Sequence, residues 1–163
     1  MPVGVAVYTE VEHVATMFIR APADALLVVD AGGLGRPVVE YLRTELGREA
    51  RRCIGVQITS GTAAKRRTGC EWPVPKFDLV RGVEVALETG RLVIPPEAEG
   101  AQDLRRELED FRYEYTKSSR PRLTFNARPG CHDDMLVAVA LGIWGARGLT
   151  IHVSATGEDC GRR

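Results

Sequence analysis

With 163 residues, of which 44% are hydrophobic and 27% charged, the chain has the length and composition of one globular domain with its own core. Its 22 basic and 22 acidic residues cancel, so no overall field attracts a polyanion, and nucleic-acid binding would need local basic clusters. The four cysteines form no CxxC pair, and we recognise no membrane-length apolar run and no secretory signal, so we expect reduced thiols in a cytoplasm.

Strand-like and helix-like segments alternate in the first part of the chain, as in an α/β or mixed α+β domain. The run ALLVVD at residues 25–30 is almost continuously apolar, which predicts a buried central strand. Pro37 suits the first turn of a helix, which Gly47 can end. In chain order, we expect strands over 3–8 and 13–20 with a turn near Glu10, a strand over 25–30, a helix over 37–46 and a strand over 53–59.

The second part of the chain is richer in helices. Residues 60–75 are polar, basic and rich in glycine and proline, which predicts a surface loop or irregular hairpin. In chain order, we then expect a helix over 76–89, a short strand over 91–94, a helix over 99–111, a hairpin of 112–116 with 123–127, and a final helix over 132–146.

Asp30 is the first candidate for chemistry, because it ends the most apolar strand and is followed by a glycine-rich turn. Ligands of parallel sheets bind beyond the carboxyl ends of the strands, where a carboxylate can hold a metal ion. The same carboxylate could instead cap the turn that follows, and the residues leave both roles open. A dinucleotide site is disfavoured, since Val38 stands where the third glycine of G-x-G-x-x-G belongs.

The second candidate is the sequence GCHDD at residues 130–134, directly before a helix that is apolar nearly all round. Acidic residues at a helix N-terminus can simply cap the helix. Because such an apolar helix must be buried, its first turn would also face the edge of the sheet, where Asp133 and Asp134 could meet Asp30. Carboxylates gathered in this way can hold two hard cations that activate water and stabilise the leaving oxygen of a phosphodiester.

A family pattern joins the two candidates. Its segments, in order, are 27–39 (LVVDAGGLGRPVV), 74–80 (VPKFDLV), 88–95 (ETGRLVIP), 104–111 (LRRELEDF) and 132–141 (HDDMLVAVAL). Together they resemble the C-terminal nuclease domain of phage large terminase subunits, over about residues 26–146.

This resemblance implies a ribonuclease H-like α/β fold over residues 1–150, with a central mixed β-sheet flanked by helices, and a loose tail over 151–163. It implies a DNA endonuclease that cuts concatemeric viral DNA with two Mg²⁺ or Mn²⁺ ions during genome packaging in a bacterial host cell. Asp30 then corresponds to the second acidic ligand, and Asp134, with Asp133 beside it, to the third. The implied partners are double-stranded DNA, a separately encoded terminase ATPase and a portal, and no membrane.

Basic residues and a histidine receive roles from the same resemblance. His132 would position groups near the metals, since hard cations prefer oxygen ligands, although a capping imidazole fits equally well. Lys76 would face the scissile backbone or simply be a solvated lysine at a helix start. The loop cluster Lys65, Arg66 and Arg67 would contact DNA phosphates, whereas without the resemblance it would be a solvated surface. Trp72 could pack under this loop or stack on a base, and packing is favoured. Trp144 belongs to the core.

The front of the chain departs from the family pattern. The family carries its first aspartate on an opening strand, about two hairpin strands before the position of Asp30. The only acids that precede Asp30 are Glu10, Glu12 and Asp24, and none stands in the centre of a predicted strand. We therefore expect the first strand and its aspartate to be missing. The chain also contains no G-x-x-x-x-G-K-[ST] phosphate loop, so the ATPase half is not expected in it.

Two functional hypotheses follow. The first is a terminase-type metal-dependent endonuclease domain, impaired by the loss of the first catalytic aspartate. The second is a non-catalytic prophage relic or interaction module that keeps the fold but cannot hold two metals. A carboxylate on a first strand would distinguish them, and the sequence favours impaired catalysis.

Overall fold

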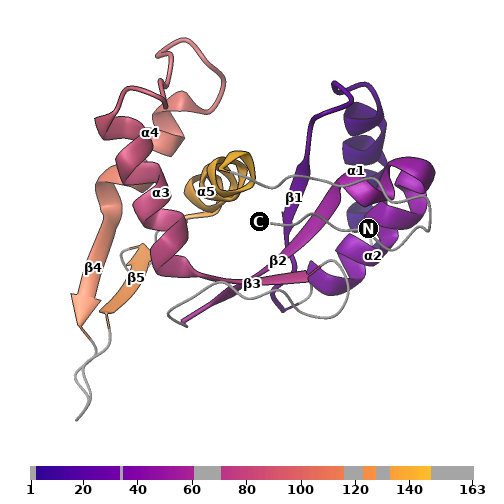
Figure 1. Ribbon diagram of the computed structural model, residues 1–163, viewed down its shortest axis with the longest axis horizontal. Helices are drawn as coiled ribbons and strands as arrows, with labels where there is room; N and C mark the ends of the chain where they lie inside the picture. The colour runs from indigo at the N-terminus through magenta and orange to yellow at the C-terminus, as the bar shows by residue number, and fades with distance from the viewer. Residues whose placement is uncertain (1–2, 34, 61–70, 116–122, 128–132, 148–163) are drawn as a thin grey trace.

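The computed structural model describes residues 3–33, 35–60, 71–115, 123–127 and 133–147, and shows an α/β arrangement (Figure 1). Its sheet has three strands in the order β1-β2-β3, all parallel. The strands are β1 (Leu27–Asp30), β2 (Cys53–Thr59) and β3 (Glu71–Pro75). A separate antiparallel hairpin pairs β4 (Phe111–Tyr115) with β5 (Leu123–Ala127).

Helices lie on both faces of the sheet (Figure 1). They are α1 (Val3–Ile19), α2 (Gly35–Leu46), the 3-10 helix η1 (Gly47–Arg52), α3 (Lys76–Glu88), α4 (Ala101–Asp110) and α5 (Asp134–Ala146). No helix in the described ranges is both long enough and apolar enough to cross a membrane.

Alternate residues of β1 belong to two different hydrophobic cores, as expected for a strand with both faces covered. Leu27 and Val29 face α1 and α2, in a core that includes Phe18, Leu42 and Cys53. Val28 faces α5 on the other side of the sheet. That second core is the larger one, and it gathers side chains from β2, β3, α3, α4 and α5.

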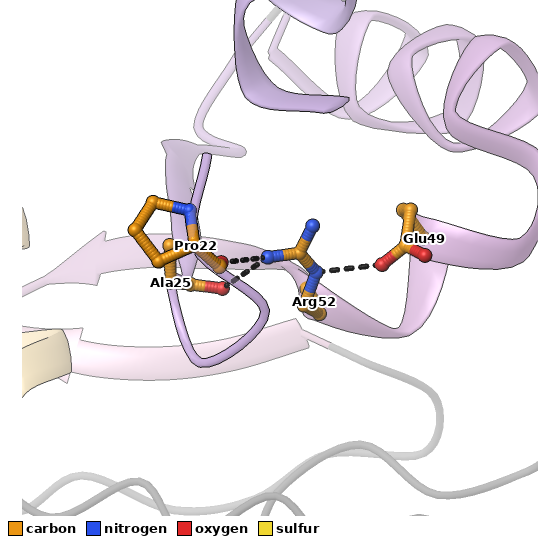
Figure 2. Close-up of polar contacts among 4 residues, drawn as sticks. All are labelled: Pro22, Ala25, Glu49 and Arg52. Atoms are coloured by element: carbon orange, nitrogen blue, oxygen red, sulfur yellow. Dashed lines mark hydrogen bonds and ion pairs between the residues drawn. The ribbon is translucent and has the colours of Figure 1, made fainter. Parts of the chain in front are cut away.

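Arg52 is the one charged side chain among the described residues that is buried, with 5% of its surface exposed. Its Nη1 donates hydrogen bonds to the backbone oxygens of Pro22, at 2.5 Å, and Ala25, at 3.3 Å (Figure 2). Its Nε donates to Glu49 at 2.7 Å, and its guanidinium lies 4.5 Å from the centre of the Phe18 ring. Because Arg52 immediately precedes β2, these contacts fasten the turn before β1 to the start of β2.

The prediction of two strands over 3–8 and 13–20 is wrong, because residues 3–19 form the single helix α1. The many valines suggested strands, since β-branched residues favour them. The buried residues Val11, Ala15 and Phe18 instead follow the helical spacing of four and three residues, and they pack against α2.

The central position expected for the strand of Asp30 is also wrong, since β1 stands at the edge of the described sheet. Its continuous apolar sequence reflects coverage of both of its faces by helices. Such coverage is independent of the strand order. The expectation of a mixed sheet is likewise not met in the described strands, where the antiparallel pair is a separate hairpin.

Two local expectations need correction as well. Residues 71–75, expected in a loop, form β3 and pair in parallel with β2, whereas 61–70 lie outside the described residues. The prediction of a strand over 91–94 is wrong, because these residues have no regular secondary structure and belong to neither sheet of the described strands. The strand over 53–59, the hairpin and the helices after 76, 99 and 132 are confirmed to within about two residues, apart from the positions of the final helix that precede 133, which are not described.

Replacing Arg52 should destabilise the fold strongly. Arg52→Ala leaves two backbone oxygens and Glu49 without their donor, and we expect it to cost about 2–4 kcal/mol in free energy of unfolding. Arg51→Ala, an exposed neighbour in the same 3-10 helix, is the matched control and should change stability by less than about 0.5 kcal/mol. Urea denaturation measures both, and equal effects would contradict the anchoring role of Arg52.

The thiol of Cys53 should be protected from alkylation. Cys53 is fully buried, and this burial raises its pKa, although the nearby Arg43 guanidinium partly offsets the rise. Because the thiolate is the reactive form, we expect iodoacetamide at pH 8 to label Cys53 at least about 100-fold more slowly in the folded protein than in urea. Peptide-level mass spectrometry resolves this site. Rapid labelling under native conditions would contradict the burial of β2.

The raised pKa of the Cys53 thiol also determines how the free energy of unfolding changes with pH. The unfolded chain loses the Cys53 proton more easily than the folded chain does, so this group contributes stability below the ordinary thiol pKa. That contribution is lost as the pH rises through the raised pKa of the folded state. We expect Cys53→Ala or Cys53→Val to flatten the alkaline decline in the free energy of unfolding measured between pH 8 and 10.

Candidate functional site

A cavity of about 450 Å³ opens at the carboxyl edge of the sheet. Four charged side chains line it, namely Asp30 from the end of β1, Lys76 from the start of α3, and Asp133 and Asp134 from the start of α5. Apolar residues of β1, β2 and α5 form the rest of the wall. The structure therefore brings Asp30 together with two acids that lie about 100 residues later in the sequence, at the edge where α/β sheets bind ligands.

Asp30 is held by the glycine-rich turn that follows it. Its Oδ1 accepts a hydrogen bond from the amide of Gly32 at 2.8 Å, so the turn-capping role is present. Gly33 has a φ of 55°, in the left-handed region, and a Cβ on Gly35 would collide with the backbone oxygen of Asp30. The glycines therefore let the chain fold back over Asp30. A carboxylate has further lone pairs, so this one bond leaves acceptor capacity towards the cavity.

Asp133 does not cap α5, although it stands at the N-cap position. The amide of Leu136, in the first turn of α5, donates instead to Oε2 of Glu107 on α4 at 2.7 Å. Glu107 thus supplies the acceptor that the helix start requires. This contact removes the capping explanation for Asp133, whose carboxylate lies at the cavity wall. Asp134 occupies the first turn of α5, is exposed and lines the same cavity.

Lys76 lines the cavity. The sequence alone allows either this position or that of a solvated lysine at the start of a helix. The Lys76 Nζ lies 2.8 Å from Oδ2 of Asp133, in an ion pair whose side chains are 26% and 25% exposed. The ammonium also lies 5.5 Å from the centre of the Phe111 ring. Connectivity explains this position, because β3 ends at Pro75 and Lys76 is therefore the first residue beyond the carboxyl end of a parallel strand.

The charges and donors of the cavity suit a hard cation only in part. Carboxylate oxygens are the ligands that Mg²⁺ and Mn²⁺ prefer, and three carboxylates with one ammonium carry a formal charge of −2. However, no group of three or more histidine, cysteine or acidic side chains in the described ranges is arranged so that it could hold a metal ion. In addition, Asp133 is paired with Lys76, and Asp30 accepts a hydrogen bond from the Gly32 amide.

The three acids that precede Asp30 in the sequence do not line this cavity. Glu12 accepts a hydrogen bond from the Tyr41 hydroxyl at 3.2 Å, on the side of α1 and α2. Asp24 lines a second cavity beside the start of β1, and Glu10 is exposed on α1. Within the described part of the chain, the acids that line the first cavity are therefore those of β1 and α5.

Several predicted contacts fall outside the described residues. These are His132 and the basic cluster Lys65, Arg66 and Arg67. Trp72 and Trp144 are described, and their rings meet edge to face at 6.0 Å between centroids, each buried in the larger core. The packing role expected for both tryptophans is confirmed.

The contact between Glu107 and Leu136 should be measurable in stability. Glu107→Ala removes the acceptor from the start of α5, and we expect a loss of about 0.5–2 kcal/mol in free energy of unfolding. Glu109→Ala, on the same helix but exposed, is the matched control and should have a smaller effect. Thermal unfolding followed by circular dichroism compares the two variants. A larger loss for Glu109→Ala would contradict the capping assignment.

Comparison with known proteins finds no match for this chain among family models, curated proteins or solved structures. Its fold class is α/β, and the described residues form a three-stranded parallel sheet. What the cavity does must therefore be argued from the residues that line it.

Proposed function

We propose that this chain is a terminase-type, metal-dependent DNA endonuclease domain whose cutting is weak. The observation that supports it most is the meeting of Asp30, Asp133, Asp134 and Lys76 at one cavity, from segments widely separated in the sequence. Those are the positions to which the terminase resemblance assigns the second and third acidic ligands and the lysine near the scissile backbone. In this proposal, genome packaging with a separately encoded ATPase and portal remains the biological setting.

The side chains have distinct roles in the proposed reaction. Asp30 and Asp134 would hold Mg²⁺ or Mn²⁺ through oxygen atoms, and a bound cation would supply an activated water and stabilise the leaving 3′ oxygen. The water oxygen would add to phosphorus as the P–O3′ bond breaks, and the proton that the water loses would balance the one taken up by the leaving oxygen. The Lys76 ammonium would balance the charge of the scissile phosphate. DNA phosphates farther away would contact basic residues, for which the sequence offers Lys65, Arg66 and Arg67.

We expect weak cutting because the cavity has too few carboxylates arranged to hold two metal ions. Two-metal hydrolysis needs several carboxylates free to hold both ions, whereas Asp133 is paired with Lys76 and no ready three-ligand group exists in the described ranges. The same two observations favour the alternative function, a non-catalytic relic or interaction module that keeps the fold. Cation binding without cleavage would identify this alternative.

Mn²⁺ binding and plasmid nicking test the proposal together. We expect the unmodified chain to bind Mn²⁺ weakly, with a dissociation constant on the order of 0.1–1 mM, and to nick supercoiled plasmid slowly. Asp30→Asn and Asp134→Asn should each weaken Mn²⁺ binding about tenfold or more and remove the remaining nicking. The free Mn²⁺ signal in electron paramagnetic resonance measures binding, and agarose gels measure nicking.

The exposed acid Asp103 on α4 provides the control, because it pairs with Arg106 at the surface and lies outside the cavity. Asp103→Asn should leave binding and nicking unchanged. If Asp30→Asn behaves like this control, the cavity is not the metal site. Fast cutting by the unmodified chain, lost in Asp134→Asn, would show that catalysis is not impaired.

A further inference from the structure

The open edge of β1, which is the edge that faces away from β2, pairs with no other strand in the described part of the chain. Ala31, the residue after β1, donates its amide to the backbone oxygen of Val56 on β2 at 2.7 Å. Alternate residues of a parallel strand direct their polar groups to opposite edges, so the backbone groups of Val28 and the amide of Asp30 point away from β2. A further strand could use these groups for hydrogen bonds.

The side chains of β1 do not protect this edge against pairing. Edge strands of proteins usually carry lysine, proline or inward-pointing charges, whereas Leu27, Val28 and Val29 are a continuous apolar run. Helices cover both faces of β1, so the strand already has the surroundings of one inside a sheet. The open edge therefore has the chemistry of a strand that accepts a neighbour.

The second cavity, of about 530 Å³, lies beside the start of β1. Its walls are residues 24–28 and four small residues of α5, namely Ala138, Gly142, Gly145 and Ala146. A Cβ built on Gly142 would meet no atom of another described residue within 4 Å, so there is room for side chains of an added segment. Asp24 is exposed and is the one charged residue among the described residues that line this cavity. The cavity therefore combines an apolar surface with one negative charge.

We propose that the open edge of β1 takes up an extended segment of another protein, which pairs with β1 as a strand and carries a lysine or arginine beside Asp24. Main-chain hydrogen bonds to Val28 and Asp30 supply affinity, and small β-branched side chains on one face of the segment fill the second cavity. The positive residue complements the single charge of that cavity. This inference goes beyond the proposed function, because strand addition needs neither a metal ion nor cleavage of DNA.

Two synthetic peptides test the strand and its charge. The first, KVTVTVK, alternates valine with threonine and has lysine at both ends, so either strand direction places a lysine beside Asp24. The second, EVTVTVE, is its acidic match. We expect the unmodified chain to bind KVTVTVK with a dissociation constant on the order of 0.1 mM in fluorescence anisotropy, and EVTVTVE about two- to fivefold more weakly. Asp24→Lys should reverse this preference.

Amide hydrogen exchange, followed by nuclear magnetic resonance, locates the bound peptide. We expect KVTVTVK to slow exchange at Val28 and Asp30 at least about fivefold, whereas Val29, whose amide already faces β2, should change less. Val28→Pro removes an amide that points away from β2 and should abolish peptide binding. Val28→Ala keeps this amide and is the matched control that should still bind.

Failure of the unmodified chain to bind KVTVTVK would overturn the proposal, as would equal binding of both peptides by the unmodified chain and by Asp24→Lys. Equal binding by folded Val28→Pro would also exclude pairing at this edge. Slow exchange of Val28 and Asp30 without any peptide would mean that the edge is already occupied. If that protection rises with protein concentration, the occupant is a second copy of this chain, and if it does not, the occupant is a segment of the same chain.

Discussion

The buried Arg52 sets the register on which the carboxyl edge of the sheet depends. Arg52 precedes Cys53, the first residue of β2, and it binds the backbone oxygens of Pro22 and Ala25 just before β1. The first rung between the two strands pairs Leu27 with Cys53, directly beside these contacts. A slip of one residue would exchange the two faces of β1 and exchange its core contacts. A guanidinium suits this task, because its donors point in several fixed directions at once.

Register at the start of β1 determines what stands at its end. With Leu27 opposite Cys53, Asp30 falls opposite Val56, and β2 continues for three more residues. β3 ends level with the last residue of β2, so Lys76 leaves the sheet at that edge. The start of α5 lines the cavity between these strand ends. The last turn of α5 packs closely on β1, because a Cβ on Gly145 would lie 2.8 Å from the Val28 side chain. Anchoring at one end of the strands thus positions charges at the other.

Local patterns in the sequence predicted most of the elements, but they did not predict which elements are neighbours. The apolar runs of β1 and β2 and the helical spacing after Lys76 each reflect short-range chemistry, and the corresponding elements are present. The edge position of β1 could not be predicted from the sequence, because helices cover both of its faces and make it as apolar as a central strand. The valines of α1 favour strands locally and so predict the wrong structure, whereas the packing of α1 on α2 favours a helix.

The candidate site shows the same division. The ends of predicted strands and helices indicate Asp30, Asp133 and Asp134 as candidates, and these residues line one cavity. The pairs that set their electrostatics join residues far apart in sequence, Lys76 with Asp133 and Glu107 with Leu136. Nothing in the local sequence around Glu107 indicates that it binds an amide 29 residues later. Neither pair could therefore be predicted from the spacing of residues in the sequence.

Asp133 faces two competing demands, and the fold separates them. The start of α5 needs a hydrogen-bond acceptor, and an aspartate at its N-cap is the usual source. Glu107 meets that need from α4, which leaves the Asp133 carboxylate to the cavity. Three acids gathered at one wall repel each other, and Lys76 offsets part of that repulsion without an external ion. The helix start does not depend on Asp133, so the Asp133 carboxylate can pair with Lys76 without loss of the acceptor at the start of α5.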